Sequence, residues 1–239
     1  IANTPADISV NNDLGICGAA VTWTLPTASD NCGFDSQVIQ NGSFESGLTA
    51  WTAINNPNPL SPWTAAPIID TGFFPAISPI DENFLAGNGF DGDTGTAILY
   101  QDVNIPANGG TLTWDDQLDY DLLNFCNGCS SRIYEVQIRD LSNNVLATAK
   151  SVTALAGTSV DGDWISNSYN MNAFSGQNVR IVFVQNIPDD YSGPGAFGLD
   201  NVSFVGDSLI QTDSSGLSSG DVFPVGTTTV VYTSTDIHN

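Results

Sequence analysis

Two acidic residues far apart in the chain lie in short apolar segments that could meet in the folded protein. Glu45 belongs to the segment 41–51 (NGSFESGLTAW), and Asp200 belongs to the segment 198–204 (GLDNVSF). If the segments are neighbouring strands, their carboxylates meet, and close carboxylates repel each other unless one is protonated or a cation lies between them. Ca2+ takes oxygen ligands of this kind. The spacing alone fits two unrelated surface acids equally well.

The two segments resemble the opening and closing strands of the calcium-containing β-jelly-roll superfamily, which includes many carbohydrate-binding modules of secreted bacterial polysaccharide enzymes. Residues 111–115, 134–140 and 179–184 are similar to its middle strands, and the resemblance covers roughly residues 38–206. It is specific for the fold and only weakly specific for the ligand. The resemblance implies a structural Ca2+ whose ligands include Ser43, Glu45 and Asp200.

A turn rich in Gly and Asp supplies a further candidate ligand. Residues 87–96 (GNGFDGDTGT) would expose backbone carbonyls and short carboxylates, and Asp93 is the candidate. The turn does not follow the EF-hand spacing, so the assignment of Asp93 to calcium depends on the resemblance. A turn without a metal is the alternative.

The composition is that of an acidic, turn-rich extracellular protein. The 239 residues include 26 acidic and 4 basic ones, which gives a net charge of -22, although only 13% of the residues are charged. A hydrophobic content of 41%, with 23 Gly and 12 Pro, is sufficient for a folded core. The charge repels phosphate backbones and anionic lipids, so we expect neither nucleic acids nor membranes as partners. Adaptation to a marine or saline medium explains the acidity as well as a specific acidic function does.

The lack of a long apolar run and the spacing of the cysteines are typical of a secreted fragment. The sequence contains no run of about 18 apolar residues, as a membrane span requires, and residues 1–5 are typical of a linker within a longer protein. We therefore expect a monomeric module of a larger chain, secreted or at the cell surface of a bacterium. The cysteines form two close pairs, Cys17 with Cys32 and Cys126 with Cys129. Four cysteines permit three connectivities, and closeness in sequence favours these two pairings as disulfides, which are the default in secreted proteins. For Cys126 and Cys129, a zinc site would need two further ligands and a redox site would need a helix N-terminus, and the sequence around them offers neither.

The two ends of the chain, taken together, resemble one domain that is interrupted by another. They are similar to the HYR (hyalin-repeat) family of immunoglobulin-like sandwiches from extracellular and adhesion proteins, although the first cysteine and the last strand of that family have no counterpart here. The residues that carry the resemblance are 17–23, 26–33, 219–220, 223–229, 233–236 and Asn239. Insertion requires guest termini that lie close together, and a jelly roll with adjacent first and last strands meets that condition. The prediction is an all-β protein, a jelly-roll β-sandwich (37–206) inserted into a small immunoglobulin-like β-sandwich (1–36 and 207–239).

Polar side chains on two predicted strands are candidates for ligand binding. The strand 133–140 alternates apolar residues with polar ones, and Arg180 lies on one face of the strand 179–186. These side chains could line a concave sheet face and bind sugar hydroxyls or an acidic sugar, since the planar fork of Arg matches a carboxylate or sulfate. The alternative is that each Arg pairs with a nearby acid, with Glu135 or Asp140 available. The candidates are Glu135, Gln137, Arg139 and Arg180.

Aromatic residues in predicted loops are the second set of candidates, because sugars stack on exposed rings. For Trp51 and Trp114 the pattern predicts core positions, and for Trp164 it predicts packing against a strand. The loop aromatics either contact the ligand or anchor their loops. They are Trp63, Phe74, Tyr120 and Tyr191.

The sequence argues against catalysis. The only histidine, His238, lies next to the end, which leaves no Ser-His-Asp or Cys-His device. Asp115, Asp116 and Glu135 could supply a carboxylate pair for glycoside hydrolysis, but the surplus of acids makes such a pair uninformative. We therefore predict a non-catalytic polysaccharide-binding module of a secreted bacterial multidomain protein, with an extracellular polysaccharide as partner. An adhesin or spacer segment without a glycan site is the alternative.

Overall fold

The structure is a computed structural model that describes residues 4–26, 38–54, 62–89, 94–106, 109–126, 128–190, 193–206 and 209–234. Apart from one 3-10 turn, Asn172–Phe174, the regular elements in these ranges are β-strands. The chain divides into two compact units, one made of Ile1–Ser36 with Gly206–Asn239 and the other of Gln37–Val205. Within the described ranges, no helix has the length and apolar character of a membrane span.

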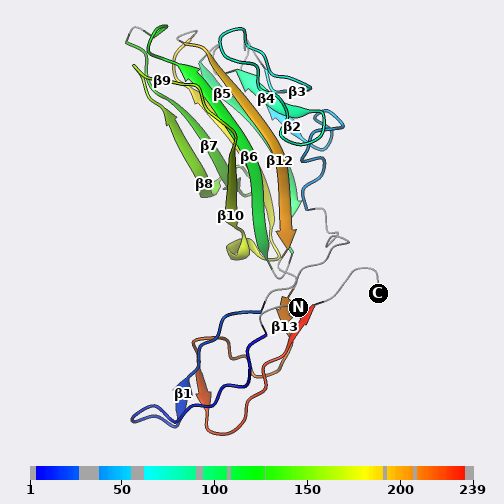
Figure 1. The fold of residues 1–239 in the computed structure, drawn as a ribbon, viewed down its shortest axis with the longest axis vertical. Helices are drawn as coiled ribbons and strands as arrows, with labels where there is room; N and C mark the ends of the chain where they lie inside the picture. The colour runs from blue at the N-terminus through cyan, green and yellow to red at the C-terminus, as the bar shows by residue number, and fades with distance from the viewer. Residues whose placement is uncertain are drawn as a thin grey trace. The chain divides into compact units, whose positions relative to one another are not determined.

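The larger unit is a jelly-roll β-sandwich of two antiparallel sheets, as predicted (Figure 1). The first sheet has the order β10-β6-β12-β4-β3, with β9 paired to β6, and the second has the order β2-β5-β11-β7-β8. The strands are β2 (Thr52–Ile54), β3 (Thr64–Ala66), β4 (Leu85–Gly89), β5 (Gly95–Asn104), β6 (Gly110–Asp121), β7 (Arg132–Arg139), β8 (Val145–Ala154), β9 (Ser159–Val160), β10 (Ile165–Asn170), β11 (Asn178–Ile187) and β12 (Gly195–Gly206).

The core lies between these two sheets and is built from the inward residues of each strand. On β11 the side chains of Val179, Ile181 and Phe183 are fully buried, as the two-residue period of a strand requires. The ring of Phe183 lies 6.0 Å from that of Trp51 and 6.3 Å from that of Trp114. The predicted core positions of Trp51 and Trp114 are therefore confirmed.

A second, smaller cluster lies beneath the segment that connects β3 to β4. Its buried members are Ile69, Ile77, Leu85 and Ala196. The half-buried Trp164 packs against this cluster, in agreement with its predicted packing role, and donates from Nε1 to the carbonyl of Ser78 at 3.2 Å.

The smaller unit combines residues from both ends of the chain. It contains β1 (Gly18–Ala20), β13 (Leu209–Gln211), β14 (Val222–Pro224) and β15 (Tyr232–Ser234), with β1 paired to β14 and β13 paired to β15. Trp23 joins the two ends, because its ring lies 5.7 Å from that of Phe223 and its Nε1 donates to the hydroxyl of Tyr232 at 3.2 Å. Cys17 is exposed and Cys32 lies outside the described residues, so their pairing stays a prediction.

Candidate functional site

The opening and closing segments of the jelly roll lie side by side. The backbone N–H of Val202 donates to the carbonyl of Gly42 at 3.0 Å. A Cβ atom added to Gly42 would lie 1.7 Å from the carbonyl oxygen of Val202, so only glycine fits here. The predicted meeting of the two segments is confirmed.

The loop that follows Gly42 is held by one asparagine. Asn41 donates from Nδ2 to the carbonyls of Gly47 and Thr49 at 2.9 and 3.0 Å, and its Oδ1 accepts the N–H of Ser46 at 3.1 Å. The indole Nε1 of Trp51 donates to the carbonyl of Asn41 at 3.0 Å. The motif therefore fixes the loop from which Glu45 extends.

Glu45 binds the loop that precedes β4. Its Oε1 accepts the backbone N–H groups of Asn83 and Phe84 at 2.8 and 2.7 Å, and its Oε2 accepts Nδ2 of Asn83 at 3.3 Å. Desolvation acts to raise the pKa of Glu45, but these hydrogen bonds outweigh it and the pKa is lowered. Glu45 is thus held as a carboxylate that caps two backbone donors.

Asp200 binds the same loop from the closing strand. It is fully buried, and its Oδ2 accepts the N–H groups of Ile80 and Asp81 at 3.1 and 3.2 Å, while its Oδ1 accepts the N–H of Asn201 at 2.8 Å. Burial raises the pKa of Asp200 to about 6, although the three backbone hydrogen bonds act to lower it. Glu45 and Asp200 therefore converge on residues 80–84.

The residues at this seam fit a calcium ion only in part. Ser43 adjoins Gly42, and Asp93 lies outside the described residues. In the part of the chain that the structure describes, no three His, Cys, Asp or Glu side chains form a group that could hold a metal. The oxygens of Glu45 and Asp200 already accept backbone N–H groups, so a calcium ion would have to share them with the 80–84 loop and draw further ligands from backbone carbonyls.

The four polar candidates of the predicted strands lie together on the outer face of the second sheet. Arg180 on β11 lies directly opposite Arg139 on β7, and Val182 and Val184 lie opposite Gln137 and Glu135. The alternate residues of β7 and β11 point the other way, into the core, and are fully buried. Val182 and Val184 share the outer face, yet they are 0% and 6% exposed. Neighbouring side chains therefore shield them from solvent. The structure thus unites this part of the predicted site.

A chain of hydrogen bonds runs along β7 on this face. Arg139 donates from Nε to Oε1 of Gln137 at 2.7 Å, and Gln137 donates from Nε2 to Oε2 of Glu135 at 2.5 Å. The amide of Gln137 is therefore oriented by a donor on one side and an acceptor on the other. Burial, and then the charge of Arg180, lower the pKa of Arg139, while Glu135 acts to raise it.

Arg180 is held from three sides. Its Nε and Nη2 donate to the two carboxylate oxygens of Asp102 on β5 at 2.6 and 2.9 Å, and its Nη1 donates to Oδ1 of Asn143 at 2.6 Å. The guanidinium carbon lies 3.9 Å from the ring centroid of Tyr100, a cation–π contact. The hydrogen bonds to Asp102 raise the pKa of Arg180. The predicted alternative partners, Glu135 and Asp140, do not pair with Arg180.

Tyr100 and Asp102 are the members of this face that the sequence analysis did not identify. Both border an open pocket of about 320 Å³, whose lining also includes Gln40, Ala50 and Thr52 from the segment that leads into β2. The available signal was the two-residue period of a strand, which places Ile98, Tyr100 and Asp102 on one face once 97–102 is taken as a strand. Their partner on β11 could be named only from the strand register, in which Arg180 lies opposite Asp102.

Two of the predicted loop aromatics are buried and offer no exposed ring. Trp63 is 4% exposed and packs edge-on against Phe197, with the ring centroids 5.6 Å apart, so its prediction as an exposed ring is wrong. Tyr120 is 7% exposed within the main core, so the same correction applies. Phe74 is half-buried and packs against the smaller cluster, and Tyr191 lies outside the described residues.

The three acids considered for hydrolysis lie on different faces. Asp116 extends into the interior, where its Oδ2 accepts the hydroxyl of Tyr134 at 3.0 Å. Asp115 lies on the outer face of the first sheet and accepts from Ser166. Glu135 lies on the outer face of the second sheet. The sheets therefore separate these carboxylates.

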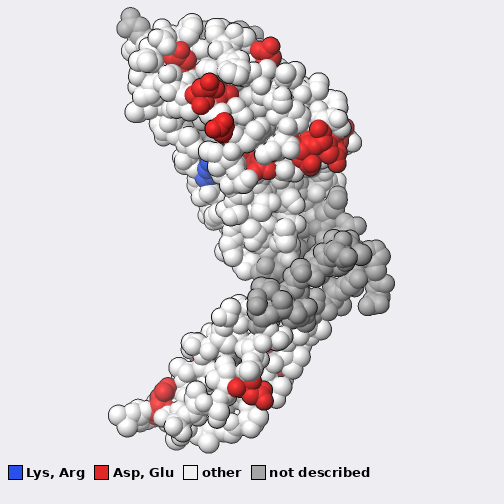
Figure 2. Space-filling view, in the orientation of Figure 1, with Lys and Arg blue, Asp and Glu red and all other residues white. Residues whose placement is uncertain are grey.

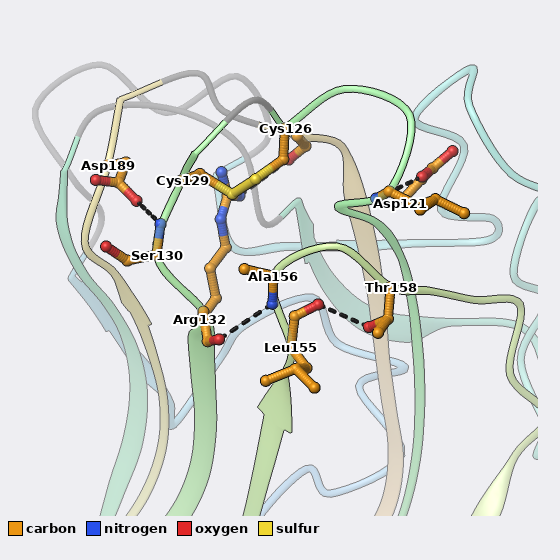
Figure 3. The surroundings of a disulfide bond; sticks show 12 residues. Asp121, Cys126, Cys129, Ser130, Arg132, Leu155, Ala156, Thr158 and Asp189 are labelled. Carbon is orange, nitrogen blue, oxygen red and sulfur yellow. Dashed lines mark hydrogen bonds between the residues drawn. A yellow bond between two sulfur atoms is a disulfide. The ribbon is translucent and has the colours of Figure 1, made fainter.

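The Cys126–Cys129 pair forms a disulfide, as predicted, in the loop between β6 and β7 (Figure 3). Beneath it the fully buried Arg132 extends toward the disulfide and donates from Nη1 to the carbonyl of Gly193 at 3.0 Å. The N–H of Ser130 donates to Oδ2 of Asp189 at 2.5 Å. The disulfide therefore closes a loop that is also tied to the segment after β11.

No protein-family model and no curated protein sequence matches the chain. Among solved structures, the chain is similar to the complex of TmCBM61 with beta-1,4-galactotriose (13% identity, 72% of this chain and 99% of that one, TM-score 0.43). It is also similar to the K3 adhesin domain of Lys-gingipain from Porphyromonas gingivalis (18% identity, 71% of this chain and 97% of that one, TM-score 0.46). A third similar structure is the enzymatically active domain of tailspike protein 4 from bacteriophage CBA120 (11% identity, TM-score 0.42). The likeness covers 70% of this chain but only 21% of the tailspike chain. Likenesses at this level carry no information on the ligand.

Proposed function

We propose that this chain is a non-catalytic polysaccharide-binding module of a secreted bacterial multidomain protein, and that its site is the outer face of β5, β11 and β7. Its proposed partner is an extracellular polysaccharide, and the module is proposed to act as a monomer. We also propose that the smaller unit, made of residues 1–36 and 207–239, is the HYR-like domain into which the jelly roll is inserted. The observation that supports a binding site is the gathering of Tyr100, Gln137, Arg139 and Arg180 on one rigid sheet face.

The physical basis of the proposed binding is a polar, rigid surface beside an open pocket. The hydrogen bonds from Arg139 to Gln137 and from Gln137 to Glu135 fix these side chains before a ligand arrives, so little side-chain entropy is lost on binding. Sugar hydroxyls can donate to Glu135 and accept from the guanidinium group of Arg139. The half-buried ring of Tyr100 borders the pocket and offers apolar surface to a sugar ring.

Affinity electrophoresis in gels that contain plant or marine polysaccharides tests this proposal. We expect retarded migration in at least one gel, and a loss of affinity of about threefold to tenfold in Tyr100→Ala, because an aromatic contact contributes about 0.5–1.5 kcal/mol. Thr113→Ala, on the outer face of the other sheet, is the matched control and should migrate as the parent protein does. If Tyr100→Ala melts early, Glu135→Ala replaces it.

Unretarded migration in every gel would exclude the polysaccharide site and favour the adhesin or spacer alternative. Release of reducing sugar from any of the polysaccharides would contradict the non-catalytic assignment.

We further propose that Ca2+ is held at the seam by Ser43, Glu45, Asp93 and Asp200. The convergence of Glu45 and Asp200 on residues 80–84 supports it. When bound, the ion would supply positive charge between the two carboxylates. At about a hundred times its dissociation constant it would stabilise the fold by about 2.7 kcal/mol.

We therefore expect chelation to lower the melting temperature by roughly 5–10 °C, since 1 kcal/mol corresponds to about 2–4 °C for a unit of this size. Asp200→Asn, which removes a charged ligand, should melt at the same temperature with calcium and with chelator. A parent protein whose melting temperature is the same in both buffers would show that backbone donors alone satisfy these carboxylates.

A further inference from the structure

Two of the four basic residues of this acidic chain face each other on the proposed binding face. Arg139 and Arg180 occupy directly opposite positions on β7 and β11. Like charges in opposite positions of neighbouring strands destabilise a sheet unless other groups compensate them. The two guanidinium groups are compensated very differently. Within the described part of the chain, this difference leaves one of the two guanidinium groups free to bind an anionic group of a ligand.

Arg180 is neutralised within the protein. Asp102 binds it through both carboxylate oxygens, and Asn143 takes a third hydrogen bond. The side chain of Arg180 is 13% exposed, so little of it remains for a ligand. Its role is to hold Tyr100 and to place a positive charge beside Arg139.

Arg139 is not neutralised in this way. It donates from Nε to the neutral amide of Gln137, and the described residues supply it with no ion pair. The described residues also supply no hydrogen-bond acceptor for its Nη1 and Nη2, and the side chain is half-buried. A guanidinium group offers its two Nη groups as a planar fork for a carboxylate or sulfate.

The remaining basic side chains cannot take that role. Arg132 is fully buried, and Lys150 is bonded to Asp116 at 2.6 Å in the interior. The visible surface carries many acidic side chains and little Lys or Arg (Figure 2). A net charge of -22 repels a polyanion everywhere else, so non-specific binding of one is disfavoured.

We propose that Arg139 receives an anionic oxygen substituent, a carboxylate or a sulfate ester, of a polysaccharide that lies across β7 and β11. This inference rests on the proposed function and specifies its ligand as an acidic polysaccharide. Gln137 is a positioning residue, because its amide holds Nε of Arg139 and leaves both Nη groups directed to the ligand. Arg180 adds a second positive charge without a direct bond.

Affinity electrophoresis on three probes tests this inference: neutral β-1,4-galactan, polygalacturonate and a sulfated galactan. We expect retardation by at least one of the two acidic probes, and a loss of about tenfold or more in Arg139→Gln, because hydrogen bonds between charged groups are lost. Ser168→Asp is the matched control, since it changes the net charge by the same one unit, on the other sheet. It should change the affinity less than twofold. Melting curves verify that both variants are folded.

The two acidic probes identify the substituent, since a carboxylate site retains polygalacturonate and a sulfate site retains the sulfated galactan. Retardation by the neutral galactan alone, or acidic binding that is unchanged in Arg139→Gln, would overturn this inference and leave the proposed function intact. Migration that no neutral or acidic polysaccharide retards would overturn the proposed function itself. Equal losses in Arg139→Gln and Ser168→Asp would show that net charge, and not this site, controls binding.

Discussion

Replacement of Asp116 by alanine is expected to lower the free energy of unfolding of the jelly-roll unit by about 3–5 kcal/mol, because it removes the charged partner of the half-buried Lys150 and leaves buried donors unpaired. Asp116 is 4% exposed and lies 2.6 Å from the Nζ of Lys150. Its oxygens also accept Nδ2 of Asn167 at 3.1 Å, Nε1 of Trp114 at 2.9 Å and the hydroxyl of Tyr134 at 3.0 Å. One carboxylate therefore satisfies four buried or half-buried donors.

This network joins the two sheets at one edge of the sandwich. Lys150 and Tyr134 belong to the second sheet, and Asp116 belongs to the first. Burial, and then the charge of Asp116, raise the pKa of Tyr134 well above its usual value, so the hydroxyl remains a donor. Loss of Asp116 thus leaves unpaired donors on both sheets, and each of them carries its own desolvation cost.

Urea denaturation of Asp116→Ala measures this effect, and Asp102→Ala is its matched control. Both acids lie 2.6 Å from a base, but the side chain of Asp102 is 46% exposed, against 5% for Asp116. The two bases are similarly covered, but water can reach the space that Asp102 leaves and Arg180 keeps its hydrogen bond to Asn143, so we expect Asp102→Ala to be the less destabilising change. A change in Asp116→Ala no larger than that in Asp102→Ala would contradict the structural role of the network.

The polar face was accessible from the sequence because it depends on a local pattern, whereas the jelly-roll fold was expected from the resemblance of the segments 41–51 and 198–204 to a known superfamily. Alternation in 133–140 assigned Glu135, Gln137 and Arg139 to one face of a strand, and the structure has them there on β7. A two-residue period fixes the face of a side chain wherever the strand pairs. The short spacing of Cys126 and Cys129 gave their pairing in the same local way.

The residues that bond across strands could not be predicted from the sequence, because their pairing depends on the register of the strands. Nothing near Arg180 in the chain indicates Asp102, which becomes its partner only when β11 pairs with β5. Asp116 and Lys150 are likewise joined across the sandwich. A one-residue slip would exchange the two faces of either strand.

Burial of the loop aromatics also escaped local reasoning. Trp63 lies in a segment rich in Pro and Asn, which predicts irregular structure but does not tell whether a side chain points inward. In the structure a short strand, β3, begins at the next residue, and the indole is carried into the core against Phe197. Large aromatic rings gain most from burial, so tertiary packing decides their position.

Gly42→Ala tests the seam that was predicted from sequence, and we expect it to lower the free energy of unfolding by about 3 kcal/mol, the upper end of the usual cost of overpacking. The new methyl group would lie 1.7 Å from the carbonyl oxygen of Val202, so the two segments must separate. That separation breaks the hydrogen bond from Val202 to Gly42 and withdraws the loop that carries Glu45. Gly42 does not have a positive φ, so the cost comes from contact and not from backbone conformation.

Gly47→Ala in the same loop separates these two causes. Gly47 has a φ of 67° and open space around its Cβ position, so its replacement costs only the strain of left-handed backbone, about 1–2 kcal/mol. Denaturant unfolding should therefore rank Gly42→Ala as clearly more destabilised than Gly47→Ala. The reverse order would mean that the opening segment can leave the closing strand at little cost. Glu45 and Asp200 would then not be held against the same loop, and a shared cation site would lose its structural basis.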